Sequence, residues 1–149
     1  MRSRSSSDPE QVLAFAIELA RTVHDSKCTD VTLLDVRGRR PETDFILIAS
    51  GTSQRQMRST AQGCEDLGKA QGNAPYRNSA DTGTTWVVVD FVEVVVHLFE
   101  PEQRMYYDLE LLYTGSKRIR WQRVNDAETR GSPTVGRSGE QAESQDASA

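Results

Sequence analysis

The spacing of hydrophobic residues along the chain predicts three helices and five strands. Apolar residues three and four positions apart indicate the helices, and continuous or alternating apolar runs indicate the strands. The expected elements are a helix at 9–27, strands at 31–36 and 43–50, a helix at 54–71, strands at 74–78, 86–90 and 94–99, and a helix from 101. This order is typical of an α/β fold in which helices pack on a mixed sheet of about five strands.

Two helices carry clear end or interior signals. Ser7 or Asp8 can cap the first helix, and Pro9 suits its first turn, where the amide has no helical partner. Gly63 and Gly68 each weaken the second helix by about 1 kcal/mol relative to alanine. The stripe expected to be buried in the first helix comprises Val12, Phe15, Ala16, Leu19, Ala20 and Val23.

Apolar residues are scarce at both ends of the chain. Hydrophobic residues make up 36% of the 149 positions, and residues 1–7 and 122–149 contain very few of them. Such segments do not bury enough apolar surface to fold. We therefore expect one folded domain at 8–121, a disordered N-terminal tail at 1–7 and a disordered polar C-terminal tail at 122–149.

The formal net charge is −4. Neutralisation of phosphates supplies most of the affinity of nucleic-acid-binding proteins, so we expect no direct sequence-specific binding of nucleic acid by this acidic chain. Acidity suits docking on a basic protein partner.

The two cysteines, Cys28 and Cys64, are not part of a Cys-x-x-Cys pair. This spacing argues against structural zinc and favours two reduced thiols in a cytoplasmic protein. No apolar run approaches the ~20 residues of a membrane span. The N-terminal residues lack the hydrophobic stretch of a secretory signal.

The segment 86–113 contains the candidate functional residues. Trp86, Val88 and Asp90 share one face of a strand, and the pattern leaves open whether Trp86 is a core residue or an interface anchor. His97, on the next strand, can share a face with Asp90 and either orient a polar surface or satisfy itself in the core. No nucleophile motif lies near His97, so a structural or docking role is favoured over catalysis.

Gly51-Thr52-Ser53, between a strand and a helix, has the form of an anion-binding turn. Metal-dependent nucleotidyl transfer would also need a pair of carboxylates on one face. Asp90 is alone in its strand, while Asp108 and Glu110 are two positions apart on an expected helix and face different sides. We therefore expect a turn and a helix cap here, and no catalytic residue, metal site or cofactor.

Two ordered blocks of the chain resemble the ribosomal silencing factor family, also called iojap-like, over about residues 10–114. The first block is TDFILIASGTSQRQ at Thr43–Gln56. The second follows the family pattern of Trp, apolar run, Asp, turn, apolar run, His and a helical motif. Its matching positions are Trp86, Val87–Val89, Asp90, Phe91–Glu93, Val94–Val96, His97, Glu102, Arg104, Tyr107, Leu109 and Glu110.

The resemblance implies a fold similar to that of nucleotidyltransferases and a function without enzymatic activity. It implies a translational repressor that binds large-subunit ribosomal protein fourteen, blocks joining of the small subunit and lowers translation under nutrient limitation. It also implies a homodimer when the protein is free. The residues expected to bind the ribosomal protein are Trp86, Asp90, Phe91, Glu93, His97, Arg104 and Tyr107.

The chain departs from the family pattern at two places beside this expected interface. Ser79-Ala80 stands where a Glu-Gly pair is usual, and Val92 stands where the hairpin turn usually has glycine. Because a β-branched residue resists positive φ, the sequence leaves the geometry of the turn at Val92 open. The alternatives are a nucleotide-binding or nucleotidyl-transferring protein on a related fold, and an adaptor for another basic protein.

Overall fold

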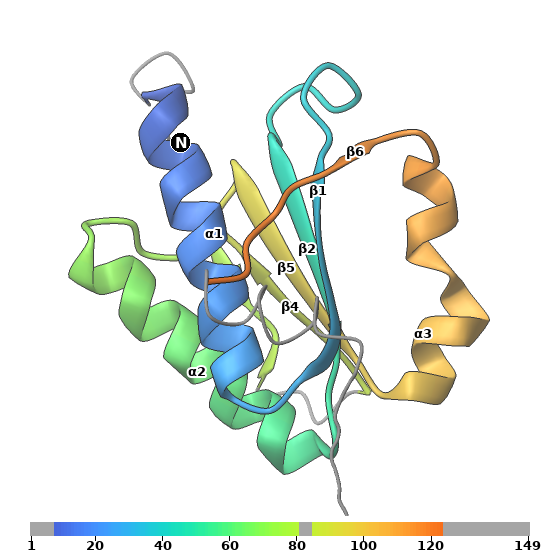
Figure 1. Ribbon diagram of the computed structural model, residues 1–149. Helices are drawn as coiled ribbons and strands as arrows, with labels where there is room; N and C mark the ends of the chain where they lie inside the picture. Colours follow the sequence, from blue (N-terminus) through green and yellow to red (C-terminus); the bar gives the residue numbers. More distant parts are fainter. Residues whose placement is uncertain (1–7, 81–84, 124–149) are drawn as a thin grey trace, which may run out of the picture.

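A computed structural model describes residues 8–80 and 85–123, and a six-stranded mixed sheet lies at its centre (Figure 1). The strand order is β3-β4-β5-β2-β1-β6; β2 and β5 are parallel, and the other neighbours are antiparallel. The strands are β1 (Thr29–Asp35), β2 (Phe45–Ser50), β3 (Arg77–Asn78), β4 (Trp86–Asp90), β5 (Val94–Phe99) and β6 (Lys117–Arg118). The helices are α1 (Pro9–Asp25), α2 (Gln54–Ala70), α3 (Pro101–Tyr107) and the 3-10 helix η3 (Leu109–Tyr113).

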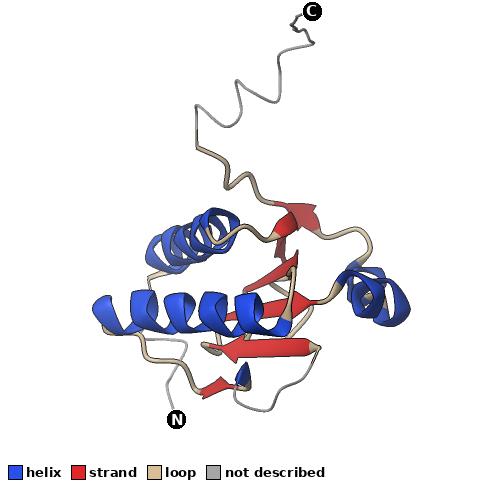
Figure 2. Cartoon of the chain, turned by 90° about the horizontal axis from the view of Figure 1, so that it is seen from below, coloured by secondary structure: helices blue, strands red, loops and turns tan. Residues whose placement is uncertain are grey.

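The helices cover the two faces of the sheet unequally (Figures 1 and 2). The long helices α1 and α2 lie on one face, and the short α3 lies on the other. β2 is buried at every position, which confirms the expected central strand. No helix within the described ranges is long and apolar enough to cross a membrane.

Helix α1 forms as its sequence predicts. The Asp8 carboxylate accepts the Glu10 amide at 3.0 Å, and Pro9 occupies the first turn. Its six predicted apolar positions are all buried against α2 and the sheet. Phe15 meets Phe91 edge-on, with ring centroids 5.0 Å apart. The stripe of α1 therefore builds the larger of two cores.

Helix α2 requires a glycine at position 68, where the sequence indicated only a residue that lowers helix stability. A Cβ atom on Gly68 would lie 2.5 Å from both the Phe91 ring and the Asn73 carbonyl oxygen. At Gly63, the nearest atom to such a Cβ is a methyl group of Thr22 at 3.7 Å. Only Gly68 therefore permits the close approach of the helix to its surroundings.

Gly68→Ala is expected to lower the free energy of unfolding by about 1–3 kcal/mol, because the added methyl group overpacks the core. Gly63→Ala, one turn and a half earlier, is the matched control and is expected to raise it by up to about 1 kcal/mol through helix propensity. Urea unfolding of both variants measures the difference. Equal effects at the two positions would contradict the close approach at Gly68.

The hairpin turn between β4 and β5 keeps a positive φ in spite of its valine. Val92 has a φ of 75°, which costs a β-branched residue about 1–3 kcal/mol. The Asp90 carboxylate accepts the Val92 amide at 2.8 Å, and the Glu93 amide donates to the Phe91 carbonyl at 3.0 Å. These bonds hold the strained turn.

Three local predictions were wrong. The helix from 101 is not continuous: α3 ends at Tyr107, Asp108 adopts a left-handed conformation with φ 47°, and η3 follows. A continuous amphipathic helix would bury Met105, Leu109 and Leu112, but Met105 and Leu112 are 82% and 70% exposed, and only Leu109 of the three is buried. β6 was not predicted. The tails at 1–7 and 124–149, and most of the loop expected at 79–84, lie outside the described residues.

Candidate protein-binding surface

A groove of about 980 Å³ lies on the face of the sheet that α1 and α2 leave uncovered. β4 and β5 form its floor, η3 forms one wall, and the β1–β2 connection, with β3 and the residues just before it, completes it. Its main lining residues are Arg40, Glu42, Tyr76, Arg77, Trp86, Val88, Asp90, Val95, His97, Leu109, Leu112 and Tyr113.

Trp86 lies half-buried at this floor and supports neighbouring aromatic rings. Its ring lies 4.8 Å from those of Phe99 and Tyr107, measured between centroids. Its indole Nε1 donates to His97 Nδ1 at 3.1 Å. Trp86 is thus both a packing residue of the smaller core and part of an accessible surface, two roles that the sequence presented as alternatives.

His97 is a neutral acceptor in this arrangement. Burial, with the charges of Arg40 and Arg77 nearby, lowers the pKa of His97 to about 4. A neutral imidazole that accepts at Nδ1 has its proton on Nε2. In the strand register His97 lies opposite Val88, and Asp90 lies opposite Val95. The hydrogen bond of His97 is therefore made with Trp86, and Asp90 serves the hairpin turn.

Acidification is expected to destabilise the protein through His97. The imidazole of His97 takes up a proton near pH 6.5 in the unfolded chain and near pH 4 in the folded chain. The neutral imidazole therefore contributes its full stabilisation above pH 6.5, and this contribution is lost as the pH falls from 6.5 to 4. This difference in pKa corresponds to a loss of about 3 kcal/mol in the free energy of unfolding. His97→Asn keeps an acceptor for Trp86 without titrating. Unfolding of both proteins in urea from pH 7 to pH 4 measures the effect, and parallel pH profiles would contradict it.

Arg104 binds within the molecule and joins α3 to the sheet. Its Nε and Nη2 donate to the two carboxylate oxygens of Glu110, each at 3.1 Å. Its Nη1 donates to the Asp30 carbonyl at 2.8 Å and to Ser50 Oγ at 3.0 Å. The Arg104 side chain is only 11% exposed. Its role in the structure is therefore to position α3 and η3.

Two of the residues expected at the interface are buried. Phe91 is 1% exposed and packs in the core beside α1, and Glu93 is 4% exposed. The hairpin turn directs both away from solvent, while Asp90 remains half-buried at the groove. Trp86, Asp90 and His97 thus line one groove, and Tyr107 contacts Trp86 beside it. Phe91 and Glu93 expose almost no surface, although Phe91 borders the groove from below, and Arg104 binds within the molecule.

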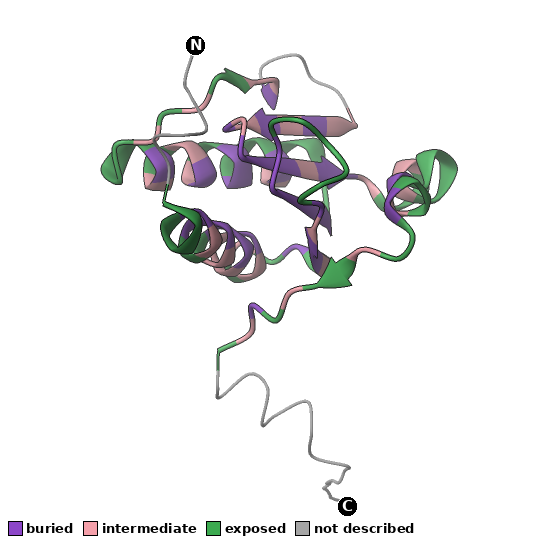
Figure 3. Ribbon diagram, turned by 90° about the horizontal axis from the view of Figure 1, so that it is seen from above, coloured by how far each residue is buried: buried purple, intermediate pink, exposed green. Residues whose placement is uncertain are grey.

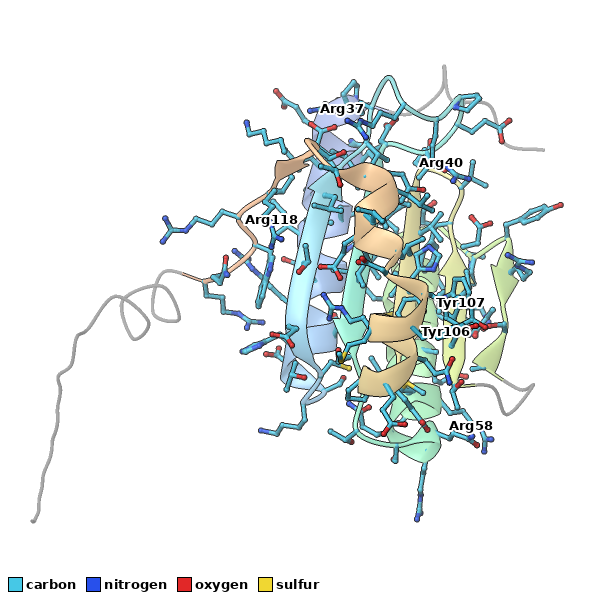
Figure 4. The ribbon with its side chains drawn as sticks, turned by 90° about the vertical axis from the view of Figure 1, so that its right-hand side faces the viewer. Arg37, Arg40, Arg58, Tyr106, Tyr107 and Arg118 are labelled. Carbon is cyan, nitrogen blue, oxygen red and sulfur yellow. The ribbon has the colours of Figure 1, made fainter. Side chains whose placement is uncertain are left out.

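Sequence reasoning missed most of the exposed apolar residues next to the groove. We call Met105, Tyr106, Tyr107, Leu111 and Leu112 of α3 and η3 the docking patch; their exposed fractions run from 49% to 82%. Figure 4 shows Tyr106 and Tyr107 on α3, and Figure 3 shows how much of this element faces solvent. The pair of adjacent tyrosines on a two-turn helix was the available signal, because both cannot face the sheet.

The N-terminus of α2 is capped by its own side chains. Ser53 Oγ accepts the Gln56 amide at 3.0 Å, and Gln56 Oε1 accepts the Thr52 amide at 3.1 Å. Residues 8–80 and 85–123 contain no group of three His, Cys, Asp or Glu side chains placed to hold a metal ion. The turn at Gly51 therefore serves as a helix start, as expected.

The described surface is that of a small α/β protein with the features of a protein-binding face. A groove with an aromatic floor adjoins exposed tyrosine, methionine and leucine side chains, which are residue types of protein interfaces.

Comparison with known proteins identifies the family. The model of the family "Ribosomal silencing factor during starvation" matches residues 9–148. The ribosomal silencing factor RsfS of Haemophilus influenzae is 34% identical over 105 residues, which cover 68% of this chain and 99% of that protein. The chloroplastic protein Iojap of Zea mays is 36% identical over 107 residues, covering 71% of this chain but 46% of that protein. The chain spans about half the length of the plant relatives that it matches.

Solved structures agree with this result. A crystal structure of a Chromobacterium violaceum protein has a TM-score of 0.64 and 30% identity, covering 74% of this chain and 90% of the other. The chain belongs to the ribosomal silencing factor family. The name of the family places it among the proteins that regulate translation. Its mixed α/β fold is the one expected, and is compatible with the nucleotidyltransferase-like topology.

Proposed function

We propose that this chain represses translation by binding the large ribosomal subunit through large-subunit ribosomal protein fourteen. The bound chain then blocks joining of the small subunit and lowers translation under nutrient limitation. The observation that carries the proposal is the docking patch, whose five apolar side chains are exposed beside the groove floored by Trp86. An exposed apolar patch of this kind is costly in water and marks an interaction site.

The groove supplies a polar rim around these apolar anchors. Asp90 and Glu42 line it together with Arg40 and Arg77, so the rim is of mixed charge rather than acidic. Mixed rim charges fix the orientation of a partner, while desolvated aromatic anchors supply most of the affinity. This pattern supports one defined pose on a protein surface.

The proposed repression is steric. A domain that occupies the subunit-joining face prevents an inter-subunit contact without any chemical step. This requires a rigid docking element, and the hydrogen bonds of Arg104 provide it by tying α3 and η3 to β1 and β2. A rigid element loses little conformational entropy on binding, which favours affinity.

We further propose that the free chain is a cytoplasmic homodimer that covers the docking patch with a second copy. Dimerisation would remove the same apolar side chains from water and would compete with the ribosomal partner. Cys28 and Cys64 are both free, as is usual in a reducing compartment.

Sedimentation of the protein with purified large subunits, and separately with isolated ribosomal protein fourteen, tests the proposal. Binding to both at low and moderate salt is the expected result. Binding to neither would overturn it. Capture of another basic protein through the same face, with no binding to large subunits, would replace it by the adaptor function.

A further inference from the structure

We propose that a basic end of the sheet, separate from the docking patch, binds the phosphate backbone of RNA. The basic end comprises Arg37, Arg39, Arg40, Lys117 and Arg118. The inference rests on the proposed function, since it gives the chain a second contact with the large subunit through ribosomal RNA.

The two segments that form the basic end are unusually rich in cations for a chain with a net charge of −4. They read RGRR at 37–40 and KRIR at 117–120, with no acidic residue among these eight positions. All five residues of the basic end are exposed. Figure 4 shows Arg37 and Arg40 at one end of the molecule, Arg118 of β6 further down one side, and Arg58 at the opposite end.

Hydrogen bonds hold the two segments together in space. Arg39 Nη2 donates to the Thr114 carbonyl at 2.7 Å, just before β6. In the sheet register Lys117 lies opposite Asp35 and Arg118 opposite Leu34. Segments about 75 positions apart in the sequence therefore lie side by side at this end of the sheet.

The acidic groups nearby do not neutralise this surface. Arg37 donates to both carboxylate oxygens of Asp35, at 3.0 and 2.6 Å, so one arginine balances that charge. Asp44 is buried, and Glu42 is exposed on the same connection. Three cations, Arg39, Arg40 and Lys117, thus exceed the one exposed carboxylate of Glu42 on this connection. Arg118 borders a hollow that Asp30, Asp108 and Glu110 also line, so its charge is balanced in part.

Phosphate is the chemistry that fits this surface. Arginine presents planar donors that match phosphate oxygens, and contacts to phosphates position a protein without reading sequence. The surface is too small to bind RNA tightly by itself, which agrees with the acidic net charge. Arg40 also lines the groove, so the basic end is continuous with the proposed protein interface and adds to it when both partners lie in one particle.

The double variant Lys117→Gln/Arg118→Gln tests the inference. Its affinity for large subunits at low salt is expected to fall about 10-fold or more, and the slope of log K against log salt is expected to decrease by about 1–2, corresponding to two lost phosphate contacts. Its affinity for isolated ribosomal protein fourteen is expected to stay unchanged. Arg55→Gln/Arg58→Gln, on exposed positions of α2, is the matched control and should change neither.

An unchanged salt slope, or an equal loss of affinity for the isolated ribosomal protein, would overturn the RNA contact. If the unaltered chain binds neither large subunits nor the isolated protein, the proposed function fails on its own. In that case filter binding of a short RNA at low salt decides the basic end. If Lys117→Gln/Arg118→Gln retains less RNA on the filter than Arg55→Gln/Arg58→Gln, the RNA contact of the basic end is supported. Equal retention of RNA by the two variants overturns it.

Discussion

Trp86→Ala is expected to weaken binding to the large ribosomal subunit by about 2–4 kcal/mol, which is roughly 30- to 1000-fold in affinity. Trp86 forms the floor of the groove and contacts the ring of Tyr107 in the docking patch. Its removal takes away one of the aromatic contacts of that tyrosine, which retains Phe99 and Tyr106, and opens a hollow under the interface. Equilibrium binding to purified large subunits measures the loss.

Two further variants separate binding from folding. Tyr106 is 80% exposed, so Tyr106→Ala is expected to weaken binding while the free energy of unfolding changes by less than about 0.5 kcal/mol. Ser59→Ala, on an exposed position of α2, is the control and should change neither quantity. Unaltered affinity in both Trp86→Ala and Tyr106→Ala would show that the partner binds elsewhere.

Arg104→Ala is expected to lower the free energy of unfolding by about 2–3 kcal/mol. The guanidinium of Arg104 is largely shielded from water. Its removal leaves Glu110, Ser50 and the Asp30 carbonyl without this hydrogen-bond donor. Removal of one partner of a buried pair costs about 3–5 kcal/mol, and the 30% exposure of Glu110 reduces this figure. Arg104→Lys should recover little, because lysine does not form the two-pronged bond.

Arg123 offers a matched control for Arg104. It also binds both oxygens of a carboxylate, that of Asp25, at 3.0 and 2.9 Å, but the two side chains are 45% and 54% exposed. Arg123→Ala is therefore expected to cost less than about 1 kcal/mol. Urea unfolding, with hydrogen exchange of α3 and η3, compares the variants. Equal costs at the two positions would contradict the role of Arg104 in positioning α3.

The sequence predicted the larger core well, because its pattern depends on regular periodicity. The stripe of α1 and the continuous run of β2 each match one element buried along its length. The β4–β5 hairpin followed from two β-branched runs around a short turn. These elements satisfy local propensity and tertiary packing together, which is why the pattern alone was sufficient.

The candidate surface was harder to predict, since it depends on tertiary contacts. The left-handed conformation of Asp108 ends α3 after two turns, and nothing in the spacing of apolar residues marks it. β6 consists of two exposed basic residues and forms only because η3 returns the chain to β1. The choice of a left-handed residue and the pairing of a polar strand are set by neighbours far away in the sequence.

Dependence on tertiary contacts also explains why some residues expected to bind the partner are instead buried. Arg104 and Phe91 occupy motif positions whose side chains point inward, where Arg104 holds α3 and Phe91 fills the core. A motif shows that a residue type recurs in a pattern but does not separate packing from binding. Trp86 illustrates the overlap, because it contacts Phe99 in the smaller core and also lines the groove.

Subunit joining tests the central claim most directly. Purified large subunits are first incubated with the protein, small subunits are then added, and the particles are separated on a sucrose gradient. We expect the protein to migrate with large subunits, joined particles to decrease in proportion to the amount bound, and Trp86→Ala to restore joining. Normal joining with the protein bound to every large subunit would contradict the claim.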